Sequence, residues 1–197
     1  MPTIYYIRHG QTVWNEQGRL QGALDSPLNE LGRKQSVHAG HVLSDLLARD
    51  RQNAASLAFV ASPLGRARQT MDMLRGVLRL PLSGYAIDDR LRELGYGAWE
   101  GSTLAEAQAK DPELFARREA EKWTMTPPGG ESYVAVQARM SEWYRELAAD
   151  TVAVAHGGTA RALMVVLGLE TPESAANLKT EQGAVYVFSD NGVKKYS

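Results

Sequence analysis

The sequence predicts an α/β fold, a three-layer sandwich with a largely parallel central sheet. Two observations support this prediction. Short apolar runs alternate with longer segments of helical periodicity, and each run is four or five residues long with mostly β-branched or aromatic side chains. Strands that alternate with helices usually pair in parallel and bury both faces of their sheet. With 197 residues, of which 44% are hydrophobic, the chain is long enough for one such domain with a substantial core.

Four apolar runs are the predicted strands of this sheet. The runs at 4–7, 57–60 and 152–155 are short and bounded by turn or helix-start signals, which is typical of buried strands. A fourth run spans 184–188. The turn signal Asp190-Asn191-Gly192 follows it, so we expect a hairpin that brings a closing strand back along the fourth.

Four helices are expected between and after these strands. A helix beginning at Asn29 runs to about Arg49 and buries apolar side chains at Leu31, Val42, Leu46 and Leu47. Ser62 is predicted to cap a second helix with Pro63 in its first position, followed at helical spacing by Met71, Leu74 and Leu78. Ser132 caps a third helix, whose apolar stripe is Tyr133, Val136, Met140, Trp143 and Leu147. Gly157-Gly158-Thr159 opens a fourth that ends near Gly168.

The chain is predicted to form a single domain over residues 1–197. No repeat, low-complexity tract or Ser/Gly-rich linker divides it. Residues 95–130 contain Pro112, Pro127, Pro128 and two short helical segments, which favours a small cap-like insertion over a separate domain.

Charge and cysteine content exclude several functions. The 22 basic and 23 acidic residues leave a net charge of −1, so no overall basic field attracts nucleic acid or anionic lipid. The absence of cysteine excludes disulfides, thiolate-bound metals and thiol nucleophiles. The N-terminus lacks a secretory signal pattern, and the most apolar segment, 163–169, is too short to span a membrane. We therefore expect a cytoplasmic protein without nucleic-acid or membrane partners.

Two histidines and two arginines are predicted to meet at one edge of the sheet. The first strand leads into Arg8-His9-Gly10 and the third into His156-Gly157-Gly158, while the second is followed by a helix that carries Arg66 early. Ligands of open α/β sheets bind beyond the carboxyl ends of the strands, and the free N–H groups at Gly157 favour an anion there. These residues indicate an anion pocket, and the planar arginine groups favour phosphate.

The same residues suggest a chemical role. A neutral imidazole can attack phosphorus, and a second imidazole can stabilise the negative charge that develops on the phosphoryl oxygens. A carboxylic acid is still needed to protonate the departing oxygen. Glu93 is the candidate, with Glu100 as the alternative.

Four sequence blocks resemble the histidine phosphatase superfamily, and more closely its phosphoglycerate-mutase-like phosphatase branch. The blocks follow the family's order and cover the chain from the first strand to the last long helix: Arg8-His9-Gly10-Gln11-Thr12 with Asn15, Ser62-Pro63-Leu64 with Arg66-Ala67 and Thr70, Leu91 and Glu93 with Gly97 and Glu100-Gly101, and His156-Gly157-Gly158. The resemblance implies a phosphoglycerate-mutase-like fold with the insertion placed over the active site, and hydrolysis of small phosphomonoesters through a phosphohistidine.

The resemblance also implies roles for individual residues. His9 becomes the nucleophile, and Glu93 donates the proton and later activates water. The transferred phosphoryl group is bound by Arg8, Arg66 and His156, helped by Asn15 and the N–H of Gly157. Gln21 and Gly22 occupy positions that contact the substrate, a small phosphorylated metabolite. The resemblance implies that hydrolysis needs no metal and no organic cofactor.

Two other functions remain open at this point. A phosphoglycerate mutase returns the phosphoryl group to an acceptor other than water, and it differs from a phosphatase mainly in differential binding. A non-catalytic phosphate-binding module keeps the arginines but has no need of His9 or Glu93, which this chain retains. Arg117, Arg118 and Lys122 either attract an anionic substrate or form a solvated helix face.

Overall fold

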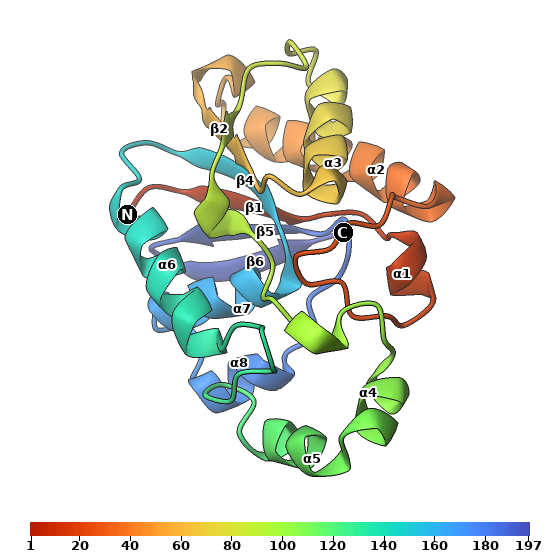
Figure 1. Cartoon of the computed structure of the whole chain (residues 1–197). Helices are drawn as coiled ribbons and strands as arrows, with labels where there is room; N and C mark the ends of the chain where they lie inside the picture. Colours follow the sequence, from red (N-terminus) through yellow and green to blue (C-terminus); the bar gives the residue numbers. More distant parts are fainter.

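A computed structural model describes all 197 residues and shows a six-stranded mixed sheet between two layers of helices (Figure 1). The strand order is β3-β2-β4-β1-β5-β6. In chain order the strands are β1 (Ile4–Arg8), β2 (Ala58–Ala61), β3 (Ala86–Ile87), β4 (Thr151–Ala155), β5 (Val185–Ser189) and β6 (Gly192–Tyr196). The first four run parallel; β5 is antiparallel to β1, and β6 is antiparallel to β5. The predicted fold class is confirmed.

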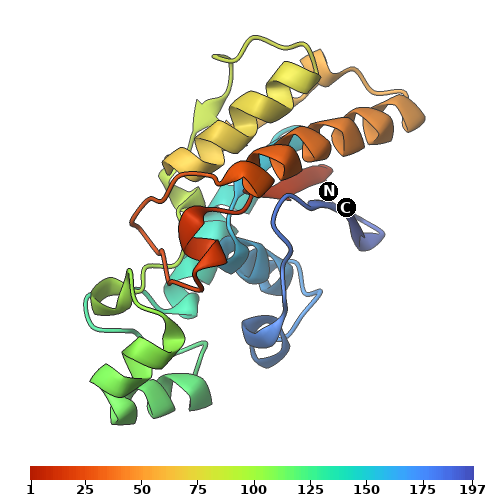
Figure 2. The same ribbon diagram turned by 90° about the vertical axis from the view of Figure 1, so that its right-hand side faces the viewer.

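Helices cover both faces of the sheet. Figure 2 shows α2 and α3 together on one side and the later helices on the other. The helices are α1 (Val13–Glu16), α2 (Glu30–Arg49), α3 (Gly65–Val77), α4 (Leu104–Lys110), α5 (Pro112–Ala120), α6 (Tyr133–Arg145), α7 (Gly157–Val166) and α8 (Pro172–Asn177). Three short 3-10 helices are η1 (Ala54–Ser56), η2 (Asp89–Leu91) and η3 (Gly97–Trp99). No helix is long and apolar enough to span a membrane.

The alternation of side chains along the strands divides the core in two. Tyr5 and Ile7 of β1 pack with α2 and α3, whereas Ile4 and Tyr6 point to the opposite face. On the face toward α6 and α7, the core also contains Met140 and other side chains of α6. These belong to the apolar stripe that was predicted for the helix capped by Ser132. Each helix layer therefore buries its own side of one sheet.

Most predicted boundaries are confirmed. Asn29 caps α2, because its side chain accepts a hydrogen bond from the N–H of Gly32 at 2.8 Å, and Ser132 caps α6 in the same way at 3.3 Å from Ala135. The predicted hairpin closes as β5 and β6. The sequence reading missed the two-residue strand β3 and the short helices α1 and α8.

Two local predictions are wrong. Ser62 does not cap α3, which begins at Gly65 with Leu64 as its N-cap, because the Ser62 hydroxyl lies 2.7 Å from Nε2 of His156 instead. Leu31 is 49% exposed, because the buried face at the start of α2 passes through Gly32 and Ser36. Both predictions rested on the local sequence pattern, whereas contacts with other elements determine how Ser62 and Leu31 are used.

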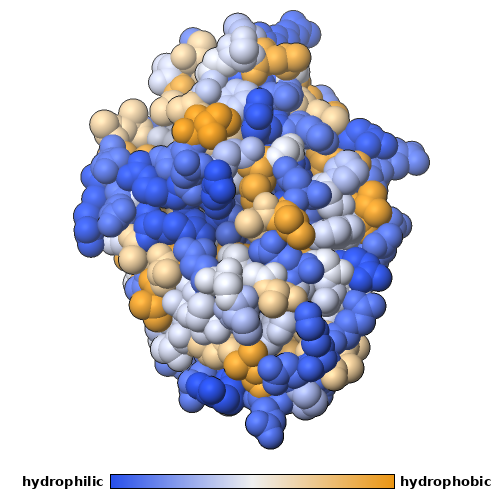
Figure 3. All heavy atoms as spheres, viewed as in Figure 1, coloured by the Kyte–Doolittle hydropathy of each residue, from blue (hydrophilic) through white to orange (hydrophobic).

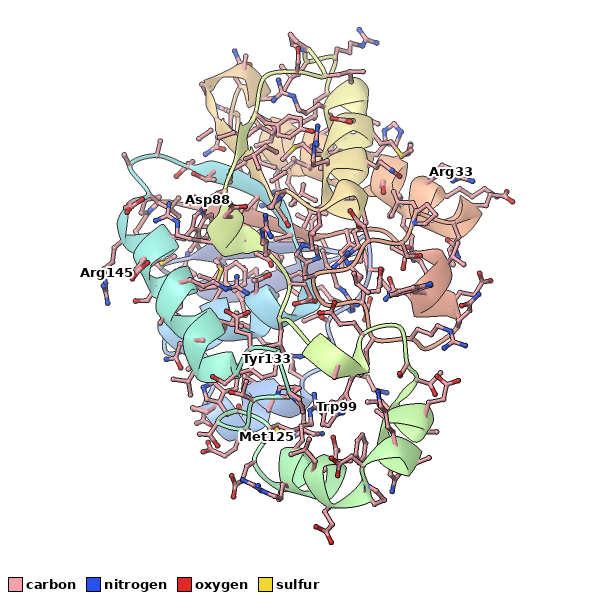
Figure 4. The ribbon with its side chains drawn as sticks, in the orientation of Figure 1. Arg33, Asp88, Trp99, Met125, Tyr133 and Arg145 are labelled. Atoms are coloured by element: carbon pink, nitrogen blue, oxygen red, sulfur yellow. The ribbon has the colours of Figure 1, made fainter.

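Residues 95–130 form η3, α4 and α5, which lie at one end of the molecule (Figures 1 and 2). A small separate core holds this segment together: Trp99, Ala107, Phe115 and Met125. Figure 4 shows Trp99 and Met125 in this region, beside Tyr133 at the start of α6. Over the face seen in Figure 3, apolar residues are scattered among hydrophilic ones and form no large continuous patch.

Candidate active site

Two histidines leave adjacent parallel strands at the same edge of the sheet. β1 and β4 are paired with Arg8 opposite Ala155, so His9 and His156 follow side by side. The N–H of His9 donates to the carbonyl of Ala155 at 3.0 Å, and the two imidazole centroids are 5.1 Å apart. Both rings are buried. The sheet therefore brings together two side chains that lie 147 positions apart in the sequence.

The hydrogen bonding of His9 identifies its free nitrogen. Nδ1 lies 2.8 Å from the carbonyl oxygen of Gly10, and a carbonyl can only accept. Nδ1 therefore carries the proton, and Nε2 keeps its lone pair. Burial, with the positive charges of Arg66 and Arg8, holds the pKa of His9 well below its usual value. His9 is thus a neutral imidazole at neutral pH, the form that can act as a nucleophile.

His156 is fixed by hydrogen bonds on both its backbone and its ring. The hydroxyl of Tyr6 accepts from the N–H of His156 at 3.1 Å, and Nε2 lies 2.7 Å from the Ser62 hydroxyl. When that hydroxyl donates to Nε2, a neutral ring carries its hydrogen on Nδ1. Burial and the nearby Arg66 hold the pKa of His156 well below its usual value. An anion bound beside this ring would oppose that shift.

Arg66 is almost fully buried and is held by one loop. Its Nη1 donates to the carbonyl of Leu24 at 2.7 Å and to Asp25 at 3.0 Å, and its Nη2 donates to the carbonyl of Gly22 at 2.8 Å. Arg66 stands in the first turn of α3, as the sequence predicts. These contacts fix the plane of the guanidinium group and leave its Nε without a protein partner.

Arg8 is held from the opposite side of the sheet. Its Nη1 donates to the carbonyl of Thr180, while its Nε is buried and unpaired. No carboxylate forms an ion pair with Arg8. Arg8 is half-buried, and placing a guanidinium group there without a counter-ion costs free energy unless a ligand supplies the negative charge.

Glu93 lies at the N-terminus of α7. Its Oε1 accepts from the N–H groups of Leu94 and Gly158, both at 2.9 Å. A β-carbon at Gly158 would collide with this carboxylate in its present position, so the glycine leaves room for it. The alternative acid, Glu100, uses Oε1 to accept from the N–H groups of Ala23 at 2.9 Å and Tyr96 at 3.0 Å. Glu100 therefore joins two loops and does not line the cavity.

Only four buried side-chain polar atoms in the protein lack a hydrogen-bond partner, and all four belong to predicted site residues. They are Nε of Arg8, Oε1 of Gln21, Nε of Arg66 and Nδ1 of His156. Leaving such an atom unpaired costs roughly 1–3 kcal/mol, so four among the predicted site residues indicate a ligand-binding site. Two are arginine donors and a third is a donor in the tautomer described above. An oxyanion would satisfy donors of this kind.

These residues surround a cavity of about 180 Å³. Its walls include eight of the predicted site residues, and His156 lies behind them, fully buried. The lining residues are Arg8, His9, Asn15, Arg19, Leu20, Gln21, Gly22, Arg66, Glu93, Tyr96, Gly157 and Arg161. The lining carries four arginines and one carboxylate; Arg19 and Arg66 also pair with Glu106 and Asp25 outside it, whereas Arg8 and Arg161 have no ion pair.

The minor predicted residues have distinct places. Asn15 lines the cavity, while its Oδ1 accepts from the N–H of Thr12 at 3.1 Å and closes the first turn of α1. Gly22 contributes its carbonyl to Arg66, as described above. Arg117, Arg118 and Lys122 lie outside the cavity, and both Arg118 and Lys122 pair with Glu119, at 2.6 and 3.0 Å. Arg117 is exposed, whereas the side chains of Arg118 and Lys122 are only 13% and 21% exposed, so the solvated-face alternative fits Arg117 alone.

Sequence reasoning missed Arg161, which lines the cavity from α7. Its Nε donates to the carbonyl of Leu178 at 2.8 Å and its Nη1 to the Tyr133 hydroxyl at 2.9 Å, with no carboxylate partner. One sequence signal was available: Arg161 stands four residues after Gly157, on the same face of a helix. No group of three or more His, Asp or Glu side chains is arranged to hold a metal ion.

Comparison with known proteins gives a consistent picture. Residues 4–194 match the histidine phosphatase superfamily (branch 1). A bifunctional protein of Mycobacterium tuberculosis is 39% identical over 137 residues, 70% of this chain; the chain spans only 35% of that relative's length. A 2,3-bisphosphoglycerate-dependent phosphoglycerate mutase of Beijerinckia indica is 30% identical over 192 residues, covering 94% of this chain and 90% of the mutase. A solved mycobacterial glucosyl-3-phosphoglycerate phosphatase in complex with VO₃ superimposes with a TM-score of 0.81 at 33% identity, covering 100% of this chain and 96% of that one.

Proposed function

The chain belongs to the histidine phosphatase superfamily, and from this membership and the geometry of the cavity we propose that it hydrolyses small phosphomonoesters through a phosphohistidine at His9. The observation that carries the proposal is the group of unpaired buried atoms on Arg8, Arg66 and His156 beside a neutral His9. A phosphoryl group supplies the oxygen acceptors that these donors lack.

In the first half-reaction, Nε2 of His9 attacks phosphorus and the bond from phosphorus to the ester oxygen breaks. Arg8, Arg66 and the N–H of Gly157 bind the phosphoryl oxygens, with Asn15 and Gln21 at the edge of the cavity. His156 stabilises the charge that develops on those oxygens. Glu93 gives its proton to the departing alcohol.

In the second half-reaction, water replaces the alcohol. Glu93, now ionised, takes a proton from the water, whose oxygen attacks phosphorus as the bond to His9 breaks. Inorganic phosphate and neutral His9 are the products. The same site residues therefore serve both half-reactions, and Glu93 acts as an acid in the first and as a base in the second.

The substrate is proposed to be a small phosphorylated metabolite. A cavity of about 180 Å³ accepts the phosphoryl group itself, and residues 95–130 provide part of its wall through Tyr96. Glucosyl-3-phosphoglycerate, named for the solved relative, is one compound to test. We place this activity in the cytoplasm, where phosphorylated metabolites are made.

Mutase activity is the second candidate, because a phosphoglycerate mutase is 30% identical over most of the chain. A mutase would transfer the phosphoryl group of the phosphohistidine to a phosphoglycerate, whereas a phosphatase transfers it to water. The two differ in the fate of one intermediate. A phosphoglycerate isomerisation assay beside a phosphate-release assay therefore separates them.

The test of the proposal is to trap the covalent intermediate. Labelled substrate is mixed rapidly with the enzyme, in excess chelator, and quenched in acid or in base. We expect a label that survives base and is lost in acid, as a phosphoramidate is, and that is missing from His9→Ala. His156→Ala should form it more slowly by about 10²–10³-fold, because that ring stabilises charge and forms no bond to phosphorus. Equal labelling of His9→Ala and wild type would overturn the assignment.

A further inference from the structure

Asp25 lies in the loop between α1 and α2, yet its carboxylate binds the start of helix α3. It accepts hydrogen bonds from the backbone N–H of Gly65 and, at 3.3 Å, from that of Arg66. Its Oδ1 also accepts from Nη1 of the Arg66 side chain at 3.0 Å. One carboxylate thus binds both the backbone and the side chain of the same arginine.

The start of α3 is built to receive this carboxylate. Its own N-cap residue, Leu64, offers no side-chain acceptor. A β-carbon on Gly65 would lie 2.8 Å from Oδ2 of Asp25, so the glycine lets the carboxylate approach without a shift. Most helices are capped by a side chain that directly precedes them in the sequence. Here Asp25, from a distant loop, caps α3 and places a negative charge at the positive end of the helix.

Asp25 does not line the cavity and is 41% exposed, whereas Arg66 is 1% exposed. Asp25 therefore reaches the reacting group only through Arg66. Three acceptors from residues 22–25 occupy both terminal nitrogens of that guanidinium group and leave Nε unpaired. Among these three acceptors, Asp25 is the only charged group. It is also the only one that accepts a hydrogen bond from the backbone N–H of Arg66.

We propose that Asp25 is a positioning residue, which caps α3 from outside and orients Arg66 for the phosphoryl group. The proposal rests on the proposed function only in that Arg66 is taken to bind phosphate. It implies that removing Asp25 weakens phosphate binding through Arg66 and not through a general loss of stability. Without Asp25, the guanidinium group loses its charged partner and can rotate away from the orientation that the cavity requires.

A double-mutant cycle tests this. The affinity for orthophosphate is measured by calorimetry, and kcat/KM with p-nitrophenyl phosphate, for wild type, Asp25→Ala, Arg66→Gln and the double variant. Asp25→Ala should weaken both quantities by about 10-fold in the wild-type background, the size expected of a lost charged hydrogen bond. In the Arg66→Gln background its effect should fall below about twofold, because the group it orients is gone. Asp25→Asn, which keeps the shape without the charge, serves if the alanine variant does not fold.

The matched control is Asp111→Ala. Asp111 caps α5, accepting from the N–H of Leu114 at 3.0 Å, and lies outside the cavity. Its removal should lower the melting temperature and leave phosphate affinity unchanged. Equal effects of Asp25→Ala in both backgrounds would overturn the positioning role while hydrolysis by wild type still stands. A wild type that binds orthophosphate but hydrolyses no phosphomonoester would count against the proposed function instead, and the binding cycle would still decide on Asp25.

Discussion

At the scale of single residues, Glu93 is the proposed proton donor, and the fold alone does not specify that role. Its carboxylate is anchored on the N–H groups of Leu94 and Gly158 and faces the same cavity as His9. The carboxyl of Glu93 therefore faces the position at which a departing alcohol would need a proton.

The leaving group separates a proton donor from a mere neighbour of phosphate. An alkyl alcohol departs as a strong base and needs a proton, whereas p-nitrophenolate does not. Glu93→Gln should therefore slow phosphorylation of His9 severely with an alkyl phosphate and much less with p-nitrophenyl phosphate. The measurement is single-turnover labelling with both substrates, since steady-state rates also contain the water step.

Glu100→Gln is the control, because Glu100 was the alternative acid and is held outside the cavity. It should show no dependence on the leaving group. Equal losses for the two substrates in Glu93→Gln would remove Glu93 from the acid role.

At the scale of elements, the N-terminus of α7 joins three parts of the site. His156 precedes the helix, Gly157 lines the cavity, and the N–H of Gly158 binds Glu93. The helix therefore sets the position of His156, the proposed phosphoryl-binding ring, and of Glu93, the proposed proton donor. Its positive end also favours the negative charges of both the carboxylate and the phosphoryl group.

Replacing Gly158 with alanine should displace Glu93, because the added β-carbon would occupy the place of Oε1. We expect Gly158→Ala to show the same leaving-group dependence as Glu93→Gln, although it leaves the carboxylate in the protein. Single-turnover labelling with the two substrates measures it. Gly76→Ala is the matched control: it lies on α3, where an added β-carbon meets nothing closer than 3.9 Å, and should stabilise the fold by about 0.4–1 kcal/mol without altering labelling. Unchanged labelling in Gly158→Ala would show that Glu93 needs no such anchor.

At the scale of the whole molecule, the fold buries two histidines at the edge of its sheet and keeps them neutral. Burial is the main reason that both pKa values lie well below the ordinary value of 6.5, and the positive charges of Arg66 and Arg8 lower them further. In the unfolded chain both rings regain an ordinary pKa. As the pH falls below about 6.5, the unfolded state binds protons that the folded state does not, so the fold loses stability.

The free energy of unfolding should therefore decrease on acidification, by at most about 1.4 kcal/mol per pH unit for each histidine. Urea unfolding between pH 7.5 and 5.5 measures this slope. Replacing His9 and His156 together with asparagine should flatten it, whereas His38→Asn, which removes an exposed histidine of α2, should not. A slope that the double variant leaves unchanged would place the acid sensitivity elsewhere.

The sequence by itself determined the elements whose signals are local. Apolar runs of four or five residues predict strands, because a strand buried on both faces of a sheet needs apolar side chains on both sides. The strands β1, β2, β4 and β5 lie at these runs. The residues that end these strands were predictable for the same reason, since parallel strands present their carboxyl ends at one edge. His9, His156, Arg8 and Arg66 thus meet at the edge that the pattern indicated. The roles assigned to them remain predictions.

Tertiary structure decided whatever depends on a partner from elsewhere in the chain. Ser62 has the local signature of a helix cap, yet its hydroxyl serves His156, and α3 receives its cap from Asp25. Arg161 looks like an ordinary helix charge until α7 is packed beside the cavity. A hydrogen bond is specified by two groups, and local sequence patterns describe only one of them. The anchors of the site therefore became visible only once the sheet and helices had been assembled.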